Sequence, residues 1–302
     1  DKLLEKKSRI LGMKRTLAAR GLSELITYSF TKQDYAEAFK ENCELVYLTN
    51  PISVDLSAMR PSLIPTLLSS VARAVNYGQA NVGFCESGNA YRAPCEQEPC
   101  VAGVRLGSVG ERNWLEKDRK VDIFDAKGDA FAVLDFCGIE ERSVEAINSA
   151  PSYYHPFRSG TLLLNKKTIG YFGELHPKIG RLFDIQEKIV CFEIFVDRLP
   201  LQRAKISFRC GKAFPKINRD FAFVFPSQAS VGNMTNAICK LDPLITKASI
   251  FDCFDLNAAQ KSVGVTVELD AVDRTLTEDE AQAVSDKIIE YVKNKGGELR
   301  GK

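Results

Sequence analysis

The sequence predicts an α+β fold divided into two domains. Short apolar runs with strand character follow one another with helical segments between them, which favours an antiparallel sheet over the regular alternation of a doubly wound parallel sheet. A length of 302 residues is typical of about two domains. The chain changes character at the basic, proline-containing stretch 199–211, and we therefore predict domains at 1–208 and 209–302.

In the first domain, the pattern predicts strands bounded by turn residues and helices that end at glycine. The expected helices cover 3–20, 61–77 and 122–137, with a short one that begins at Thr31. The expected strands cover 25–30, 45–48, 82–91, 101–106, 161–164, 168–175 and 189–196. Gly21 and Gly78 follow the first two long helices, and residues 165–167 form the turn of a hairpin.

The second domain has the order β-α-β-β-α-β of a ferredoxin-like fold. We expect strands over 220–225, 246–254, 262–269 and 298–300, and helices over 231–241 and 278–294. Thr277 and Glu280 have the spacing of a capping box, which predicts the start of the last helix.

Alternation along these strands predicts which side chains face the helices. One face is apolar and collects Phe221, Phe223, Phe225, Val263, Val265 and Val267. The other face is small and polar, with Asp252 and Phe254 contributed by the second strand. Because RNA-recognition sheets stack bases on several exposed aromatic rings, a face with at most Phe254 predicts a modest RNA contact.

Composition excludes several classes of protein. The 41 Lys+Arg against 39 Asp+Glu give a net charge of +2, and no apolar run is long enough for a membrane helix. Nine cysteines without a CxxC pair, and two histidines, lack the spacing of a metal site and favour a reducing compartment. We expect a cytoplasmic protein with no metal site, no catalytic residue, no membrane partner and no DNA partner.

Several motifs occur along the chain in the order of one known family. In the first domain they are Gly21-Leu-Ser-Glu-Leu-Ile-Thr-Tyr-Ser-Phe30, Asn50-Pro51, Met59-Arg-Pro-Ser-Leu-Ile-Pro-Thr-Leu-Leu68, Phe84-Cys-Glu-Ser-Gly88 and Gly170-Tyr-Phe-Gly-Glu-Leu-His-Pro177. In the second they are Phe214-Pro-Lys-Ile-Asn-Arg-Asp-Phe-Ala-Phe223, Phe251-Asp-Cys-Phe254, Arg274-Thr-Leu-Thr277 and Glu298-Leu-Arg-Gly301. Through these motifs nearly the whole chain resembles the C-terminal portion of the β subunit of bacterial phenylalanyl-tRNA synthetase.

The resemblance implies a first domain with a class II synthetase-like antiparallel sheet and flanking helices that has lost catalysis. It implies a ferredoxin-fold anticodon-binding domain after it, and further domains of the subunit before Asp1. The whole enzyme, a ligase of phenylalanine and tRNA, would use ATP and Mg²⁺, whereas we expect no cofactor in this chain. The implied partners are the catalytic α subunit, in an α2β2 heterotetramer, and tRNA(Phe).

A strongly apolar stripe follows Arg60 at helical spacing and is the candidate contact with the α subunit. Its predicted interface residues are Arg60, Leu63 and Leu67. The alternative is that the stripe covers the domain's own sheet and that Arg60 forms a surface or interface ion pair.

The candidate tRNA-binding residues lie in strands and loops of the second domain: Lys216, Arg219, Phe254, Lys261 and Arg300. From Cys210 to Lys302 there are twelve Lys/Arg against thirteen Asp/Glu, so we expect a local contact with a shallow salt dependence. The alternative for each cation is an ordinary solvated charge, and for Arg219 also an ion pair with Asp220.

Two other functions stay open from the residues alone. A freestanding class II enzyme that forms an adenylate or an amide would place Arg60, Glu86 and Arg198 in one site. A pure RNA-binding module is the other, although the near-neutral charge and the scarce aromatic residues of the sheet argue against it.

Overall fold

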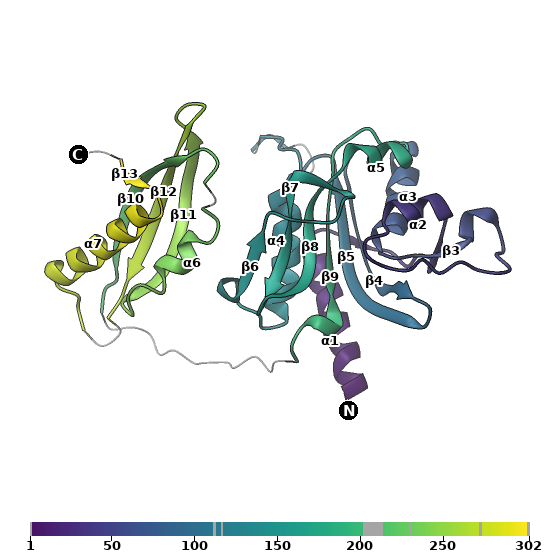
Figure 1. Ribbon diagram of the computed structural model, residues 1–302, viewed down its shortest axis with the longest axis horizontal. Coiled ribbons are helices and arrows are strands. Elements are labelled where there is room, and N and C mark those ends of the chain that lie inside the picture. Colours follow the sequence, from purple (N-terminus) through teal and green to yellow (C-terminus); the bar gives the residue numbers. More distant parts are fainter. Residues whose placement is uncertain are drawn as a thin grey trace. The chain divides into compact units, whose positions relative to one another are not determined.

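The computed structural model describes residues 2–110, 113–115, 117–201, 214–229, 231–271 and 274–300. The chain forms two compact units, 1–204 and 205–302 (Figure 1). The predicted boundary between residues 208 and 209 lies outside the described residues and stays a prediction. Within the described ranges, no helix is long and apolar enough to cross a membrane.

Seven strands form the main sheet of the first unit. They are β1 Ser23–Glu24, β4 Val82–Ala93, β5 Glu96–Leu106, β6 Val144–Ile147, β7 Tyr154–Leu164, β8 Lys167–Leu175 and β9 Ile189–Phe195, in the order β1-β4-β5-β9-β8-β7-β6. β1 pairs with β4 in parallel, and the other neighbours are antiparallel. Two further strands, β2 Phe30–Thr31 and β3 Ala58–Met59, pair with each other. The predicted α+β fold is confirmed.

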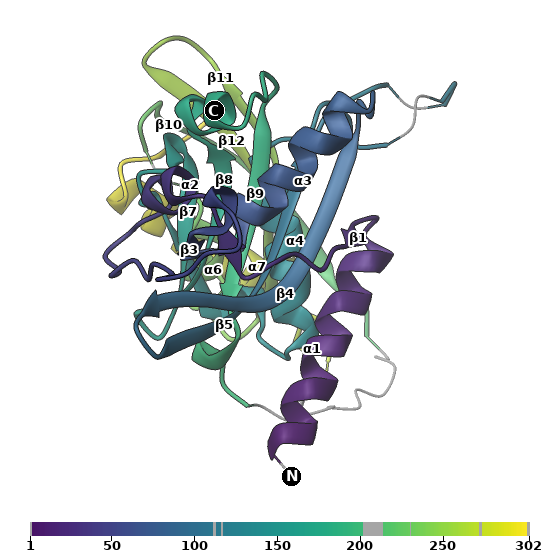
Figure 2. The same cartoon turned by 90° about the vertical axis from the view of Figure 1, so that its right-hand side faces the viewer.

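Helices cover both faces of this sheet (Figure 2). α1 Lys2–Ala19 and α4 Ile123–Phe136 pack on one face. α3 Ile64–Asn76 and α5 Pro177–Leu182 pack on the other face, together with Phe39 at the end of α2 Gln33–Ala38. Short 3-10 turns lie at Val54–Leu56, Glu141–Ser143 and Val196–Arg198. As a result, every residue of the central strand β9 is buried.

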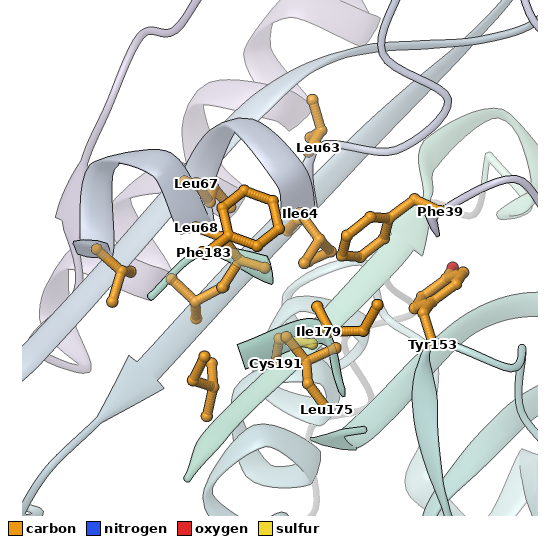
Figure 3. Packing of buried hydrophobic residues seen from close by; sticks show 14 of the residues in the cluster. Phe39, Leu63, Ile64, Leu67, Leu68, Tyr153, Leu175, Ile179, Phe183 and Cys191 are labelled. Atoms are coloured by element: carbon orange, nitrogen blue, oxygen red, sulfur yellow. The ribbon is translucent and has the colours of Figure 1, made fainter. Parts of the chain in front are cut away.

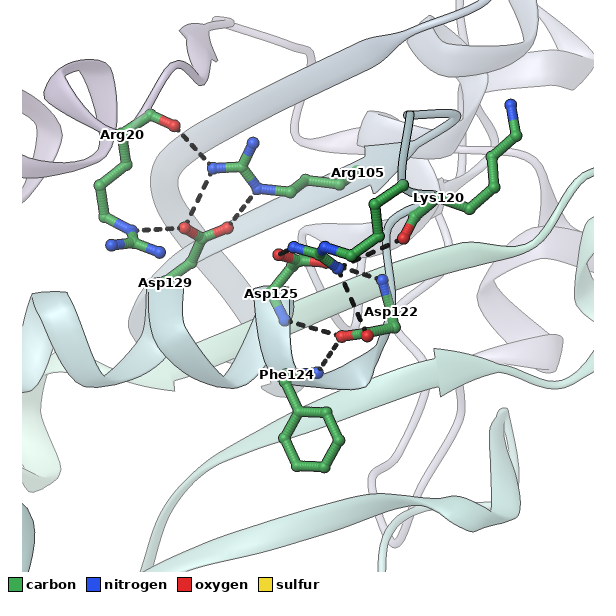
Figure 4. Close-up of polar contacts among 8 residues, drawn as sticks. Arg20, Arg105, Lys120, Asp122, Phe124, Asp125 and Asp129 are labelled. Carbon is green, nitrogen blue, oxygen red and sulfur yellow. Dashed lines mark hydrogen bonds and ion pairs between the residues drawn. The ribbon is translucent and has the colours of Figure 1, made fainter. Parts of the chain in front are cut away.

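An ionic cluster ties α1, α4 and β5 together (Figure 4). Asp129 of α4 is only 1% exposed and accepts hydrogen bonds from Arg20 Nε and Arg105 Nε, both at 2.6 Å. Arg105 also donates from Nη2 to the backbone oxygen of Arg20 at 2.7 Å. The buried carboxylate is therefore neutralised by two arginines from different elements.

The second unit has a four-stranded antiparallel sheet with two helices on one face. Its strands are β10 Ile217–Pro226, β11 Ile245–Asp255, β12 Gln260–Leu269 and β13 Glu298–Leu299, in the order β11-β12-β10-β13. Its helices are α6 Met234–Ile238 and α7 Glu278–Asn294. The core under the helices holds the predicted apolar residues of β10 and β12, so the prediction of the covered face is confirmed.

Local signals in the sequence placed some elements accurately. α7 begins at the predicted residue, and Thr277 and Glu280 form the predicted capping box. Asn165 and Lys166 both have positive φ, 50° and 65°, which suits the tight turn of the predicted β7–β8 hairpin.

Other predicted elements are shorter or absent. The strand expected over 25–30 is wrong, because only Ser23–Glu24 and Phe30–Thr31 pair, each with a different strand. The strand expected over 45–48 is reduced to one bridge between Tyr47 and Ala58. α6 spans five residues instead of the predicted 231–241.

Candidate functional sites

The first unit has a cavity of about 620 Å³ beside α3. Its lining residues are Ile26, Thr27, Tyr28, Phe30, Thr31, Lys32, Tyr35, Asp55 and Leu56, with Thr66, Ser69, Ser70 and Arg73 of α3. Four apolar side chains are strongly exposed here: Ile26, at 92%, and Tyr28 line the cavity, and Ile52 and Val54 shortly precede its lining residue Asp55 in the chain. We call these four side chains the apolar rim. Exposed apolar side chains grouped in this way are typical of a protein interface.

Arg60 and Glu86 form a buried ion pair next to this cavity. Arg60 is 2% exposed, and its Nη1 donates to Glu86 Oε1 at 2.9 Å and to Thr66 Oγ1 at 3.1 Å. Nε donates to the backbone oxygen of Asn89 at 3.1 Å. Gly88 leaves room for the guanidinium, because a Cβ at that position would lie 2.3 Å from Nη2 of Arg60. The guanidinium of Arg60 is therefore paired and hydrogen-bonded entirely within the first unit.

Two further arginines flank the ring of Phe195. The Arg92 and Arg198 guanidinium groups lie 5.2 Å and 4.0 Å from its centroid. Both donate to Glu98, Arg92 Nε at 3.0 Å and Arg198 Nε at 2.5 Å. Burial opposes the charge of Arg92, but Glu193 and Glu98 raise its pKa overall.

Glu193, on β9, connects the sheet to the start of α3. Its Oε1 accepts from Ser62 Oγ at 3.0 Å and from the backbone N–H of Leu63 at 3.1 Å. Burial raises the pKa of this carboxyl group, although Arg92 and the Leu63 N–H oppose the rise. The contact places a carboxylate at a helix N-terminus, where the helix dipole stabilises negative charge.

The predicted α-subunit residues require a correction. Arg60, Leu63 and Leu67 are buried inside the first unit, and the two leucines pack among other apolar side chains under α3 (Figure 3). Buried side chains cannot contact another chain directly, so the stripe covers the unit's own sheet, as the alternative held. The alternative of a surface or interface ion pair for Arg60 is wrong, because its pair with Glu86 is buried.

The open face of the second sheet carries Phe254 and Arg300. The Arg300 guanidinium lies 5.3 Å from the centroid of Phe254, which is 42% exposed, and Nη1 donates to Ser262 Oγ at 3.3 Å. The backbone N–H of Arg300 bonds to Ala222 O at 2.7 Å and extends the pairing of β13 with β10. An arginine thus lies across the sheet against an aromatic ring.

The other predicted tRNA contacts already have partners in their own unit. Lys216 pairs with Glu268 at 2.7 Å, Arg219 pairs with Glu278, and Lys261 Nζ donates to the backbone oxygen of Ala229 at 2.5 Å. The alternative pair of Arg219 with Asp220 is wrong, since Asp220 accepts from Thr266 Oγ1 at 2.6 Å. Phosphate binding by these cations would have to compete with these contacts, and their tRNA role stays a prediction.

Sequence reasoning missed Phe251, which is 60% exposed on the open face. Simple alternation puts Phe251 on the side opposite Asp252. A bulge between Ile250 and Asp252 breaks the alternation and turns Phe251 to the same side as Asp252. The glycine at position 264, opposite this part of the strand, was the signal that could have indicated a close contact there.

Comparison with known families matches both units. The family model of the phenylalanyl tRNA synthetase beta chain CLM domain matches residues 2–196. The chain belongs to the phenylalanyl-tRNA synthetase β chain family. The family model of the ferredoxin-fold anticodon binding domain matches residues 213–300, which include the whole second sheet.

Curated relatives in this family are phenylalanine–tRNA ligase beta subunits. Those of Paramagnetospirillum magneticum and Mesorhizobium japonicum are 36% and 38% identical to this chain, over 96% and 95% of its length. That of Rhodospirillum rubrum is 35% identical over 97% of this chain. The chain spans only 38% of the length of each of these three relatives.

Proposed function

We propose that this chain is a non-catalytic part of a phenylalanine–tRNA ligase β subunit. It supports the catalytic α subunit with its first unit and contacts the anticodon stem-loop of tRNA(Phe) with its second. The whole ligase, an α2β2 assembly in the cytoplasm, uses ATP and Mg²⁺. The proposal rests on family membership together with one observation, the pairing of Arg60, Arg92 and Arg198 with carboxylates of the same unit.

The pairing of these arginines supports the absence of catalysis. A site that forms an adenylate needs arginines aimed at a triphosphate and a carboxylate. Here Arg60 is held by Glu86, whereas Arg198 is held with Arg92 by Glu98. The residues of the alternative enzyme site therefore belong to two separate ionic clusters, and a nucleotide would have to displace their carboxylates.

The apolar rim is the surface that we assign to the α subunit. It is exposed, it adjoins a cavity that a partner side chain can fill, and Arg73 at the cavity offers a cationic group to a partner, whereas Lys32 pairs with Asp55 at 3.2 Å. Interfaces combine an apolar centre with a polar edge in this manner. The assignment replaces the buried residues Arg60, Leu63 and Leu67 as contact points.

Phenylalanine-dependent pyrophosphate exchange tests the catalytic part of the proposal. We expect no exchange from the purified 302-residue chain. Exchange by the chain alone would contradict the proposal and favour a freestanding adenylate-forming enzyme.

Size-exclusion chromatography of the chain with an α subunit from the same source tests the structural part. We expect co-elution, and we expect Tyr28→Glu at the apolar rim to abolish it, because the change buries a charge in the interface. The matched control is Phe124→Glu, at an exposed position of α4 away from the cavity. Loss of co-elution in the control alone would place the contact on α4 and overturn the assignment.

A further inference from the structure

The bulge in β11 creates an aromatic position on the open face of the second sheet. Ile250 pairs with Val265 and Asp252 pairs with Gly264, so Phe251 is the extra residue between two pairs. Residues at a bulge lose strict alternation, which lets Phe251 share the side of Asp252 and Phe254.

The ring of Phe251 packs directly against the backbone at Gly264. A Cβ on Gly264 would lie 2.8 Å from Cζ and 2.9 Å from Cε2 of Phe251, and 3.2 Å from Cβ of Asp252. Carbon atoms do not approach so closely, so the ring occupies the space that any other residue at 264 would fill. The neighbours of Gly264 on the same strand, Val263 and Val265, point to the covered core, which places the ring on the open face.

The ring of Phe251 contacts the sheet on one side and solvent on the other. Its ring contacts the sheet through Gly264, yet 60% of the residue remains exposed. Phe254 lies further along the same strand and is flanked by Arg300. An exposed ring fixed against a sheet presents its face to solvent at low cost in conformational entropy, which is what a stacking partner for a flat group requires.

We propose that Phe251, in contact with Gly264, is a second stacking surface for an unpaired base in the anticodon loop, on the same face of the sheet as Phe254. This inference rests on the proposed tRNA contact of the second unit. The occupant is a nucleotide base, because every base has a flat π face, and because the matched family model describes an anticodon-binding domain. Gly264 acts as a positioning residue, since it contacts the ring and not the RNA.

The test measures binding of the 302-residue chain to a hairpin that carries the anticodon stem and loop of tRNA(Phe), by fluorescence anisotropy. We expect Phe251→Ala to weaken binding roughly 10-fold, a change typical of one lost base stack. Phe251→Tyr keeps the ring and should bind like the unchanged chain. The dependence of binding on salt should be the same for all three proteins, because the ring carries no charge.

Gly264→Ala probes the position of the ring without altering it. The added methyl group displaces Phe251 and should weaken binding to a similar extent. In the double variant with Phe251→Ala, the two losses should not add, because both act through the same ring. Circular dichroism of each variant checks that the sheet is intact.

Removal of single bases from the hairpin loop identifies the partner of the ring. For one abasic hairpin, Phe251→Ala should cause no further loss. If the unchanged chain fails to bind the hairpin, both the proposed tRNA contact and this inference are contradicted. If the chain binds and both Phe251→Ala and Gly264→Ala bind equally well, the inference alone is overturned.

Discussion

The two sheets of this chain differ in how many of their faces are covered. Helices pack on both faces of the seven-stranded sheet, so its central strand is buried throughout. The four-stranded sheet has its core on one face only, and its other face exposes Phe251 and Phe254. A large partner can therefore reach the first unit only outside its covered sheet, whereas the second unit offers one whole sheet face.

The two units also differ in whether they contain buried ion pairs among the described residues. The first unit holds Arg60, Glu86 and Asp129 almost fully buried, and all three are ion-paired. The ion pairs described in the second unit lie at the surface, each with at least one strongly exposed partner. Buried pairs are costly to break and surface pairs are worth little, so losing a charge from a buried pair of the first unit should cost more than losing one from an exposed pair of either unit.

The largest effect is expected for Arg60→Met. The change leaves the Glu86 carboxylate buried without its partner, which costs about 3–5 kcal/mol of unfolding free energy. Equilibrium urea unfolding followed by circular dichroism measures it. Arg119→Met is the matched control, because Arg119 pairs with Asp125 at the surface and its loss should cost less than about 1 kcal/mol. Equal losses in the two variants would remove the distinction drawn between buried and exposed pairs.

A smaller effect is expected for Asp129→Asn. The side chain keeps its shape but loses the charge that accepts from Arg20 and Arg105, so the unfolding free energy should fall by about 2–3 kcal/mol. The same unfolding experiment on Asp197→Asn, which weakens the exposed pair with Lys6, provides the control and should show a change below about 1 kcal/mol. A negligible change at Asp129 would mean that the cluster adds nothing beyond packing.

The smallest effect is expected for the surface pair at the start of α7, and it depends on pH. A hydrogen bond from Arg274 and the backbone N–H of Thr277 lower the pKa of Glu280 from 4.5 to about 2. A lowered carboxyl pKa stabilises the folded state above pH 4.5, and this stabilisation is lost as the pH falls toward 2.

The contribution of this pair is measured by comparing the hydrogen-exchange rates of the α7 backbone amides in the unchanged chain and in the Glu280→Gln variant. Glutamine can still complete a capping box, so the two proteins differ by the charge alone. We expect slower exchange in the unchanged chain near neutral pH and equal protection near pH 2. A difference that persists at the lower pH would show that the carboxylate charge is not its source.

The parts of the fold that depend on local pattern could be predicted from the sequence. The alternating phenylalanines of β10 and the Thr277–Glu280 box determine burial and helix start through neighbouring residues only, and both predictions are confirmed. The strand predicted over 25–30 was wrong because the backbone of this segment and Thr27 accept hydrogen bonds from the buried Arg60, a contact between residues about thirty positions apart.

The candidate site was predictable to a lesser degree. A charged residue such as Arg60 is ordinarily placed at the surface, and only the three-dimensional positions of Glu86 and Gly88 explain its burial. Phe251 was missed because alternation counts residues and cannot detect an extra one in a strand. The tRNA contacts of Lys216, Arg219, Phe254, Lys261 and Arg300 stay predictions, as does the boundary after residue 208.

The bulge at Phe251 also affects the solubility of the chain. In the described part of the chain, β11 hydrogen-bonds to β12 on one side, and its other edge is the outer margin of the sheet. An uninterrupted edge strand of eleven residues would offer its outward backbone groups as a template on which a second copy could add a strand. The extra residue interrupts that template near its middle, so the same irregularity that turns a ring outward also discourages edge-to-edge aggregation.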